Sequence, residues 1–358
     1  MPDTLSLFVE QLPTFRVRSF CPSALLVMPD DLCLFALRES RAFGDAIAHA
    51  LDVPLSDLRE SEFGDGEHKM RPTVNVRGKD VYVVQSLYGG PTYSVNDKLC
   101  RLLFFLGALR DAAAARVTAV VPYLCYQRKD RKTQPRDPVT TRYLAGLFES
   151  VGIDRVLTMD VHNLAAYQNA FRVRNDHLEA RPLFIDSILD LAGSHDLVVL
   201  SPDEGGMKRT NRFAEGLRAV LDRPVPTAFV EKMRSGGQVS GGTLVGAVEG
   251  RVVVIVDDLI STGTTIVQAT EACAAKGAAA IHVAATHGVF VGDAAEKLAH
   301  PALTSVLVTN TIPPFRLDHT PVRNKVSVCD AAPRFAEAIR AIHAGGSVTR
   351  LNAIATEA

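Results

Sequence analysis

A chain of 358 residues is long for a single hydrophobic core, so we expect two domains. Lysine plus arginine (39) almost balances aspartate plus glutamate (40), which excludes an overall field that would attract nucleic acid or an anionic membrane. No signal peptide or long uncharged apolar stretch is evident, and the six cysteines lack the spacing of a metal site. We therefore expect a reduced, soluble, cytoplasmic protein without nucleic-acid or membrane partners.

In the first half, strands alternate with helices once the N-terminal segment is passed. Residues up to about 58 give only short strand-like patches at 25–28 and 33–36 and part of a helix at 45–51. An acidic, turn-rich loop follows at 62–67. Beyond it, hydrophobic periodicity predicts strands at 81–85, 117–122 and 155–159, separated by helices at 96–115 and 138–151.

The second half repeats this rhythm. We predict strands at 197–200, 227–230, 252–256, 281–285 and 305–309, and helices near 206–221, 264–276 and 292–299. Such alternation is typical of α/β domains with parallel sheets flanked by helices. We expect two similar domains, residues 1–180 and 181–325, with the boundary near 176–183. A last helix at 333–344 lies beyond the second sheet and is placed to pack back on the first domain.

The stretch 251–270 combines three features that suit a ligand site. Five apolar residues at 252–256 predict a buried parallel strand, with Asp257 and Asp258 at its C-terminal end. Four hydroxyls around one glycine follow and open a helix, which together can hold a phosphate: Ser261, Thr262, Gly263, Thr264 and Thr265. The aspartates can bind ribose hydroxyls or hydrated Mg²⁺. The alternative is an ordinary strand–turn–helix with capping aspartates, and the co-occurrence of all three features argues against it.

Two polar loops of the first half are further candidates. In the first, Phe63-Gly64-Asp65-Gly66-Glu67, two glycines make a tight turn that exposes an aromatic face beside two carboxylates. Alone it would more simply be a surface turn with a buried Phe anchor. The second, at 126–138, crowds five basic residues behind a predicted strand. Such a cluster is normally a solvated face, but at the C-terminal edge of a parallel strand it suits a polyphosphate clamp.

Three shorter segments complete the set. His162 follows the strand at 155–159, although a lone histidine is usually structural. Asp203, before two glycines and a helix, can hold Mg²⁺ or ribose, or simply cap the helix. Lys232 and Arg234 lead into a Gly/Ser-rich segment at 235–242. On a mobile loop these two cations can close over substrates and neutralise charge on a transferred group, whereas on a plain linker they would only be solvated.

Both in their residues and in their order along the chain, these six segments resemble the ribose-phosphate pyrophosphokinases (phosphoribosyl-diphosphate synthetases). The resemblance extends from about residue 63 to the C-terminus. The stretch 251–270 alone also resembles the signature of type I phosphoribosyltransferases, and the resemblance implies that fold for both domains. The Lys-x-Arg pair favours the kinases, because phosphoribosyltransferases need no such loop in this place.

The resemblance implies transfer of the diphosphoryl group of ATP to the anomeric hydroxyl of ribose 5-phosphate, with Mg²⁺ as cofactor and phosphoribosyl diphosphate and AMP as products. In the family the loop at 63–67 holds adenine and reaches a neighbouring subunit's ATP site, so we expect a homo-oligomer, at least a dimer and up to a hexamer. The implied roles are ATP binding by Phe63, Asp65, Glu67, Arg128, Lys129, Asp130 and His162; Mg²⁺ binding by His162 and Asp203; sugar-phosphate binding by Asp257, Asp258, Ser261, Thr262, Gly263, Thr264 and Thr265; and catalysis by Lys232 and Arg234.

Several positions depart from the family pattern. Lys129 stands where glutamine is usual and adds charge near the nucleotide, and Ser261 stands where many bacterial members carry aspartate. The segment 87–95 is longer than its counterpart, and Leu37-Arg38 replaces a usual Gly-Asn pair. These differences bear on the acceptor or on regulation.

Three other functions remain open at this point. A larger acceptor such as ADP-ribose also offers a 5-phosphate, a free anomeric hydroxyl and a ribose diol. A non-catalytic regulatory homologue would keep the fold but lose the loop lysine or the phosphate cradle, and this chain keeps both. A phosphoribosyltransferase would consume phosphoribosyl diphosphate with a base and ignore ATP.

Overall fold

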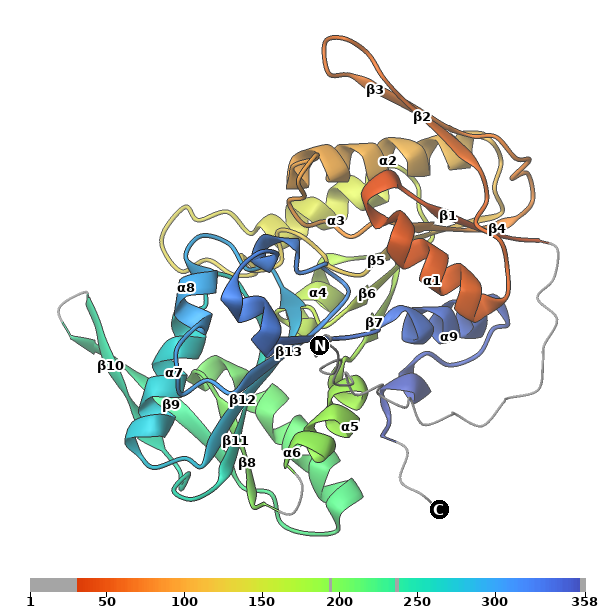
Figure 1. Ribbon diagram of the computed structural model, residues 1–358. Helices are drawn as coiled ribbons and strands as arrows, with labels where there is room; N and C mark the ends of the chain where they lie inside the picture. Colours follow the sequence, from red (N-terminus) through yellow and green to blue (C-terminus); the bar gives the residue numbers. More distant parts are fainter. Residues whose placement is uncertain (1–30, 193–194, 236–237, 355–358) are drawn as a thin grey trace, which may run out of the picture.

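Two helix-flanked sheets dominate the computed structural model, which describes residues 31–192, 195–235 and 238–354 (Figure 1). The first sheet has five strands in the order β1-β4-β5-β6-β7, and all of its pairs are parallel. The strands are β1 (Leu32–Ala36), β4 (Asp80–Val84), β5 (Arg116–Val121), β6 (Arg155–Met159) and β7 (Arg174–Leu178). The associated helices are α1 (Arg41–Leu51), α2 (Val95–Asp111), α3 (Thr140–Ser150) and α4 (Leu164–Ala170). An antiparallel hairpin, β2 (Leu58–Glu62) and β3 (His68–Pro72), projects from this half (Figure 1).

The second sheet has seven strands in the order β10-β9-β8-β11-β12-β13-β14. They are β8 (Leu197–Ser201), β9 (Thr227–Ser235), β10 (Gln238–Val245), β11 (Val252–Ile260), β12 (Ala280–Gly288), β13 (Ser305–Thr309) and β14 (Val326–Cys329). The pair β9–β10 is antiparallel and the others are parallel. The helices of this half are α5 (Arg181–Ala192), α6 (Met207–Leu221), α7 (Thr264–Ala275), α8 (Ala294–Leu298) and α9 (Ala332–His343).

The order of the second sheet places a topological switch point between β8 and β11. From β8 the chain continues outward to β9, whereas from β11 it continues in the opposite direction to β12. β11 pairs with β8 from Val252 to Ile255 but with β12 as far as Ile260. The loops after β8 and β11 therefore diverge and leave a crevice at the carboxyl ends of these strands, where open α/β sheets bind ligands.

One hydrophobic core joins the two halves. Alternate residues of both sheets face it, and the helices α1, α5, α6 and α9 fill the space between them. The last helix, α9, lies beside α1 of the first half (Figure 1). Phe335 of α9 meets Phe43 of α1 edge to face at 5.5 Å, and the Arg340 guanidinium donates to the Ala50 carbonyl at 3.0 Å. The two halves share buried surface, so we propose that the boundary near residue 180 separates two sheets and not two independent cores.

Most of the predicted elements in the described residues are observed. The strand at 305–309 has the predicted bounds, and the helices at 45–51, 96–115, 138–151 and 206–221 correspond to α1, α2, α3 and α6. The strand predicted at 25–28 lies outside the described residues. β11 is longer than predicted, so Asp257 and Asp258 lie inside the strand instead of following it. Pairing with β12 keeps the backbone extended past the point where the apolar run stops.

Several elements carry too weak a hydrophobic pattern to be predicted. β7 is an edge strand with the sequence RNDHL, of which only Leu178 is fully buried. The hairpin strands β2 and β3 are short and rich in charge, and they flank the predicted loop at 62–67, of which only Glu62 belongs to a strand. The antiparallel pairing of β10 is a second departure from the expectation of purely parallel sheets.

The segment 87–95 contacts both halves, and we call it the interdomain strap. The Glu39 carboxylate accepts the backbone N–H groups of Thr92 and Tyr93 at 3.0 and 3.2 Å. On the other side, the guanidinium of Arg316, from the second half, donates to the Gly89 carbonyl of the strap. The strap is therefore held by side chains from both halves.

A buried ion pair supports the strap from the first half. The Lys98 ammonium lies 2.6 Å from the Glu39 carboxylate, and the two side chains are only 1% and 10% exposed. The same ammonium lies over the Tyr88 ring, 3.4 Å from its centroid. Arg38, from the departing Leu37-Arg38 pair, donates to the Tyr93 hydroxyl at 3.1 Å. Two sequence departures that are far apart in the chain thus contact one another.

Across residues 31–192, 195–235 and 238–354, none of the helices combines the length and apolar character that crossing a membrane requires.

The buried pair predicts a stability effect. Lys98→Met should lower the free energy of unfolding by about 3 kcal/mol, because it leaves the Glu39 carboxylate buried without its counter-ion. Urea denaturation followed by circular dichroism measures this loss. The double variant Lys98→Met/Glu39→Gln removes the charge but keeps an acceptor for the strap, so it should be closer to the wild type. A single variant as stable as the wild type would contradict the assignment.

Candidate functional site

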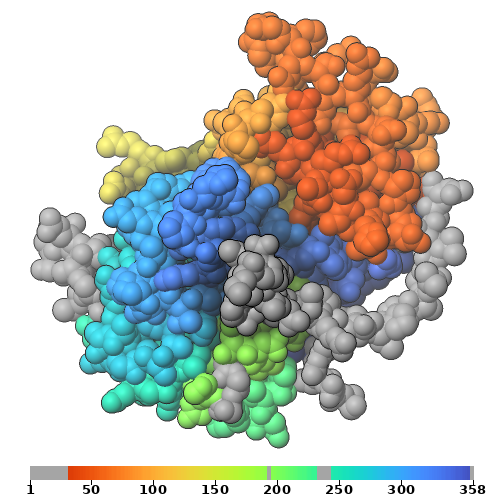
Figure 2. Space-filling model, viewed as in Figure 1, coloured from red at the N-terminus to blue at the C-terminus, as the bar shows by residue number. Residues whose placement is uncertain are grey.

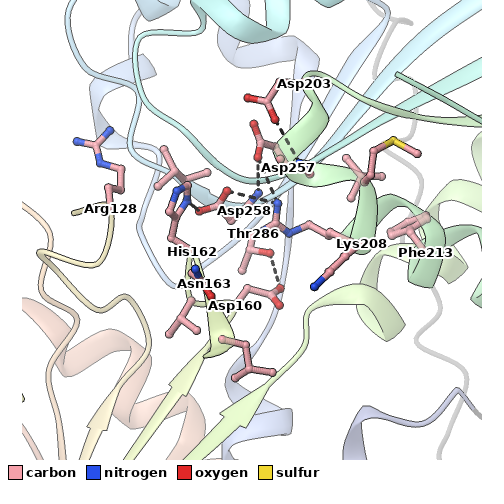
Figure 3. A pocket seen from close by; sticks show the side chains of 18 of the residues that line it. Arg128, Asp160, His162, Asn163, Asp203, Lys208, Phe213, Asp257, Asp258 and Thr286 are labelled. Carbon is pink, nitrogen blue, oxygen red and sulfur yellow. Dashed lines mark hydrogen bonds and ion pairs between the residues drawn. The ribbon is translucent and has the colours of Figure 1, made fainter. Parts of the chain in front are cut away.

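A cleft of about 1730 Å³ lies at the carboxyl ends of the strands, between the two halves (Figure 3). The second half contributes the segment after β8, the end of β11 and the start of α7. The first half contributes the end of β6 and the loop after β5. Of the residues predicted to form a site, the cleft is lined by Arg128, Asp130, His162, Asp203, Asp257, Asp258, Ser261, Thr262, Gly263, Thr264 and Thr265.

The start of α7 forms an anion cradle. Gly263 is the N-cap with φ 76°, in the left-handed region that glycine adopts without strain, and no side chain caps the helix. The first N–H groups of an α-helix lack intrahelical partners, so these are available to a ligand. Hydroxyl groups surround them, and the Thr262 and Thr264 oxygens lie 3.1 Å apart. This geometry suits a phosphate group.

An acidic pair with one guanidinium lies beside the cradle. Arg209 approaches Asp257 at 3.4 Å and Asp258 at 3.5 Å. Burial and the neighbouring Asp258 carboxylate raise the pKa of Asp257 well above its ordinary value, although Arg209 opposes this. Burial also acts to raise the pKa of Asp258, but a hydrogen bond to His162 and the charge of Arg209 more than offset it, so this pKa is lowered. The two carboxylates therefore titrate as a coupled pair.

A side-chain contact connects the two halves across the cleft. His162 Nδ1 lies 2.9 Å from Asp258 Oδ2, and the two side chains point toward one another (Figure 3). This hydrogen bond raises the pKa of His162 despite its partial burial. The backbone N–H of His162 donates to the Gln127 side chain at 2.7 Å, which connects it to the loop after β5. A residue of each half thus positions the other.

The backbone at the end of β6 is strained, and contacts with the second half stabilise it. Asp160 has φ 37°, which is unfavourable for a residue with a Cβ. Its carboxylate accepts the Thr286 hydroxyl of β12 at 2.6 Å (Figure 3). It also accepts the Ala180 N–H at 2.9 Å. The neighbouring His287 is fully buried and lies 3.1 Å from the Met159 carbonyl. These contacts fix the turn that carries His162.

Some side chains of the basic loop at 126–138 line the cleft, and others contact residues of the same loop. Arg128 and Arg131 line the cleft, and Asp130 accepts the Asn163 amide at 2.6 Å. Lys129 instead pairs with Asp137 at 2.5 Å and is not among the cleft-lining residues. Its predicted contact with ATP stays a prediction. The carboxylate of Asp137 could not be paired with Lys129 from the sequence, because the pairing depends on how the loop bends.

Three predicted ATP-binding residues lie away from the cleft. Phe63, Asp65 and Glu67 occupy the turn of the β2–β3 hairpin, which projects from the molecule (Figure 2). The Phe63 side chain is 54% exposed, so it is not the buried anchor of an ordinary surface turn. Within one chain this loop does not reach the cleft, and its role in a neighbour's site stays a prediction.

The predicted catalytic pair lies on a strand and not on a loop. Lys232 and Arg234 belong to β9, and Arg234 is in register with Val239 of β10. Their side chains fall outside the described part of the structure, so their relation to the cleft stays a prediction. The Gly/Ser-rich segment at 235–242 largely forms β10, because antiparallel pairing with β9 satisfies its backbone groups.

Among the described residues, no three His, Cys, Asp or Glu side chains gather to hold a metal ion by themselves. Asp203 lines the cleft, and its Oδ1 accepts the Gly206 N–H at 3.2 Å as the cap of a short helical turn. Carboxylates and one histidine around a phosphate cradle still fit Mg²⁺, which is commonly bound by one or two protein ligands together with water and substrate phosphates. His162 and Asp203 are the residues that would supply such ligands.

Sequence reasoning missed several residues of this site. Arg209 had no role assigned from the sequence, although its contacts with both aspartates make it central to the acidic pair. Thr286 and Gln127 gave no signal, because a threonine in a strand and a glutamine in a loop are ordinary. One signal was available for Arg209: it is a cation at the start of the helix predicted near 206–221, which follows the strand at 197–200.

Helix-flanked parallel sheets, with an acidic pair and an anion cradle at a switch point, define an α/β protein of the type I phosphoribosyltransferase-like class. The N-terminal domain of ribose phosphate pyrophosphokinase matches residues 32–152, and the phosphoribosyl synthetase-associated domain matches residues 230–352. The chain therefore belongs to the ribose-phosphate pyrophosphokinase family and is an enzyme of this type.

Individual relatives agree over almost the whole chain. Ribose-phosphate pyrophosphokinase of Caldanaerobacter subterraneus is 38% identical over 90% of this chain and 98% of its own length. Ribose-phosphate pyrophosphokinase A of Dictyostelium discoideum is 36% identical over 90% of this chain and 98% of its own length. The crystal structure of phosphoribosylpyrophosphate synthetase from Mycobacterium smegmatis superposes with a TM-score of 0.80 at 34% identity, covering 88% of this chain and 100% of that one.

Proposed function

We propose that the protein transfers the diphosphoryl group of ATP to the anomeric hydroxyl of ribose 5-phosphate and releases phosphoribosyl diphosphate and AMP. One observation carries this proposal: a single cleft brings the anion cradle and the acidic pair of the second half against Arg128 and Arg131 of the first. A phosphoribosyltransferase would need only the sugar-phosphate site of the second half. We also propose that the enzyme acts in the cytoplasm, in keeping with the free thiols of Cys33, Cys100, Cys125, Cys273 and Cys329.

The acceptor would lie on the second-half side. The cradle at the start of α7 would hold the 5-phosphate, and Asp257 and Asp258 would bind the ribose diol. Because the pKa of Asp257 is raised and that of Asp258 is lowered, the pair can offer one hydrogen-bond donor and several acceptors to two hydroxyls. Arg209 and His162 keep Asp258 in place for this contact.

The donor would lie against the first half. Arg128 and Arg131 at the cleft would contact the polyphosphate, where a guanidinium can bind two phosphate oxygens at once. Mg²⁺, when bound near His162 and Asp203, would neutralise phosphate charge. In the reaction, the anomeric oxygen attacks the β-phosphorus, the bond to the α-phosphate oxygen breaks and the hydroxyl proton is released. Such a transfer needs mainly positioning and charge neutralisation, so the lack of an obvious general base is no objection.

Ribose 5-phosphate is favoured over a larger acceptor by the position of the divergent segments. The strap at 87–95 and the pair Leu37-Arg38 are not among the cleft-lining residues. They contact each other through the Arg38 guanidinium and the Tyr93 hydroxyl. Neither segment therefore enlarges the acceptor side for a group such as ADP-ribose.

The test of this function is AMP release. With Mg²⁺-ATP and ribose 5-phosphate the purified protein should form AMP, and kcat/KM should be higher for ribose 5-phosphate than for ADP-ribose. A preference for ADP-ribose would change the acceptor but not the chemistry. Failure to form AMP with any ribosyl phosphate would favour a regulatory homologue. Consumption of phosphoribosyl diphosphate with a base, without ATP, would indicate a phosphoribosyltransferase.

The proposed role of Lys232 gives a kinetic prediction. If its charge acts mainly on the transition state, Lys232→Ala should reduce turnover about a hundredfold, or about 3 kcal/mol, with little change in ATP affinity. Steady-state kinetics and nucleotide binding separate these effects. Asp257→Asn is the matched comparison, because it should weaken use of ribose 5-phosphate and leave nucleotide binding nearly intact. Unchanged turnover in Lys232→Ala would remove this residue from the mechanism.

The exposed hairpin turn gives a prediction about assembly. If Phe63 and Asp65 complete a neighbour's ATP site, the active form is at least a homodimer, and Phe63→Ala/Asp65→Ala should be inactive. Mixing this variant with Lys232→Ala and allowing subunits to exchange should restore part of the activity, because some sites then combine two intact parts.

The control for the mixing experiment is Val74→Ala, which changes another exposed apolar residue of the same half. It should be active by itself. Subunit exchange is verified by native mass spectrometry of tagged chains. Proven exchange without recovery of activity would contradict a role of the hairpin turn in a neighbour's site.

A further inference from the structure

The anion cradle is backed by a second layer of structure. The backbone N–H of Phe290 donates to the Ile260 carbonyl at 3.0 Å, and that of Val291 donates to the Ser261 carbonyl at 3.0 Å. A Cβ placed on Gly263 would lie 3.6 Å from atoms of Lys297 and Leu298 in α8. The segment from 289 to 298 therefore packs directly behind the loop that would hold the 5-phosphate.

This second layer brings a cation to the cradle. The Lys297 ammonium donates to the Thr264 hydroxyl at 2.7 Å and pairs with Asp293 at 2.8 Å. Its side chain is 27% exposed, whereas that of Asp293 is 52% exposed, so solvent screens the carboxylate more strongly. Lys297 does not itself line the cleft, but Thr264 does. The cation therefore acts on the cleft through one hydroxyl.

The hydrogen-bond chain fixes the direction of the hydroxyl protons. A hydroxyl has one proton to donate and two lone pairs to accept with. Because Thr264 accepts from Lys297, its proton is directed away from the ammonium, to Thr262 at 3.1 Å or to a bound oxygen. In the first case Thr262 has its own proton left for the ligand. Either arrangement leaves the chain one proton to donate toward the cradle.

We propose that Lys297 is a positioning residue that orients the Thr264 hydroxyl and makes the cradle selective for a terminal phosphate monoester. This inference rests on the proposed binding of a 5-phosphate at the start of α7. A monoester carries between one and two negative charges near neutral pH, whereas an internal phosphodiester carries one. A cation held one hydrogen bond behind the cradle favours the more highly charged group by Coulomb attraction.

The primary test is binding of ribose 5-phosphate without ATP, measured by calorimetry. Lys297→Gln should bind about tenfold more weakly than the wild type, which corresponds to about 1.4 kcal/mol. Lys297→Arg keeps the charge and a donor, so it should bind nearly as well as the wild type. The matched control is Lys276→Gln, an exposed lysine at the opposite end of α7, which should not change affinity. Circular dichroism checks that each variant is folded.

The second arm tests selectivity with the methyl ester of ribose 5-phosphate, a phosphodiester of nearly the same size. The wild type should prefer the monoester, and Lys297→Gln should reduce that preference. In the reaction with ATP, Lys297→Gln should raise KM for ribose 5-phosphate and leave kcat nearly unchanged, because the 5-phosphate is remote from the reacting hydroxyl.

Three results would overturn the inference: equal affinity of wild type and Lys297→Gln, equal loss for the monoester and the diester, or no binding of ribose 5-phosphate by the wild type. The proposed function is tested by a different result. A protein that binds ribose 5-phosphate with the help of Lys297 but releases no AMP would support this inference and contradict the proposed reaction.

Discussion

The site depends on a gap in backbone pairing at the end of β11. Up to Ile255 the strand has β8 on one side and β12 on the other, and from Val256 to Ile260 the pairing with β12 continues without β8. Backbone groups on the open side must find partners other than a strand. The Asp258 N–H finds one in the Asp257 carboxylate at 2.8 Å. The gap thus opens the space in front of the acidic pair, and one carboxylate of the pair accepts a backbone N–H there.

The opposite wall of that space comes from the other half of the chain, and its position follows from packing. Both sheets contribute one face to a single core, so their carboxyl edges are held at a fixed separation. His162–Asp258 and Thr286–Asp160 cross the boundary at the bottom of the cleft. A displacement of one half would break these contacts and expose buried apolar surface. The geometry of the cleft is therefore a property of the whole fold.

Sequence reasoning succeeded where hydrophobic pattern and local chemistry agree. The buried strand at 305–309 and the start of α7 at Thr264 are apolar or small-residue runs with clear limits. It failed where tertiary contacts decide. β7 has almost no apolar residues and is a strand because β6 offers an edge. The pairing of Lys129 with Asp137, eight residues later, could not be foreseen, and the contact of Lys129 with ATP stays a prediction. The strap could be recognised as unusual, but its partners Glu39 and Arg316 could not be named without the fold.

The position of α9 has a consequence for how the chain folds during synthesis. This helix covers the side of the first half that α1 also occupies, and Arg340 contacts Ala50 across 290 residues of sequence. At ribosomal rates of roughly 5–20 residues per second, α9 is synthesised on the order of tens of seconds after α1. The apolar face of α1 lacks its partner helix during this time. During that interval the first half is made, but the core that it shares with the second half is incomplete. The nascent chain therefore carries an exposed apolar surface for most of its translation, which is the kind of surface that chaperones bind.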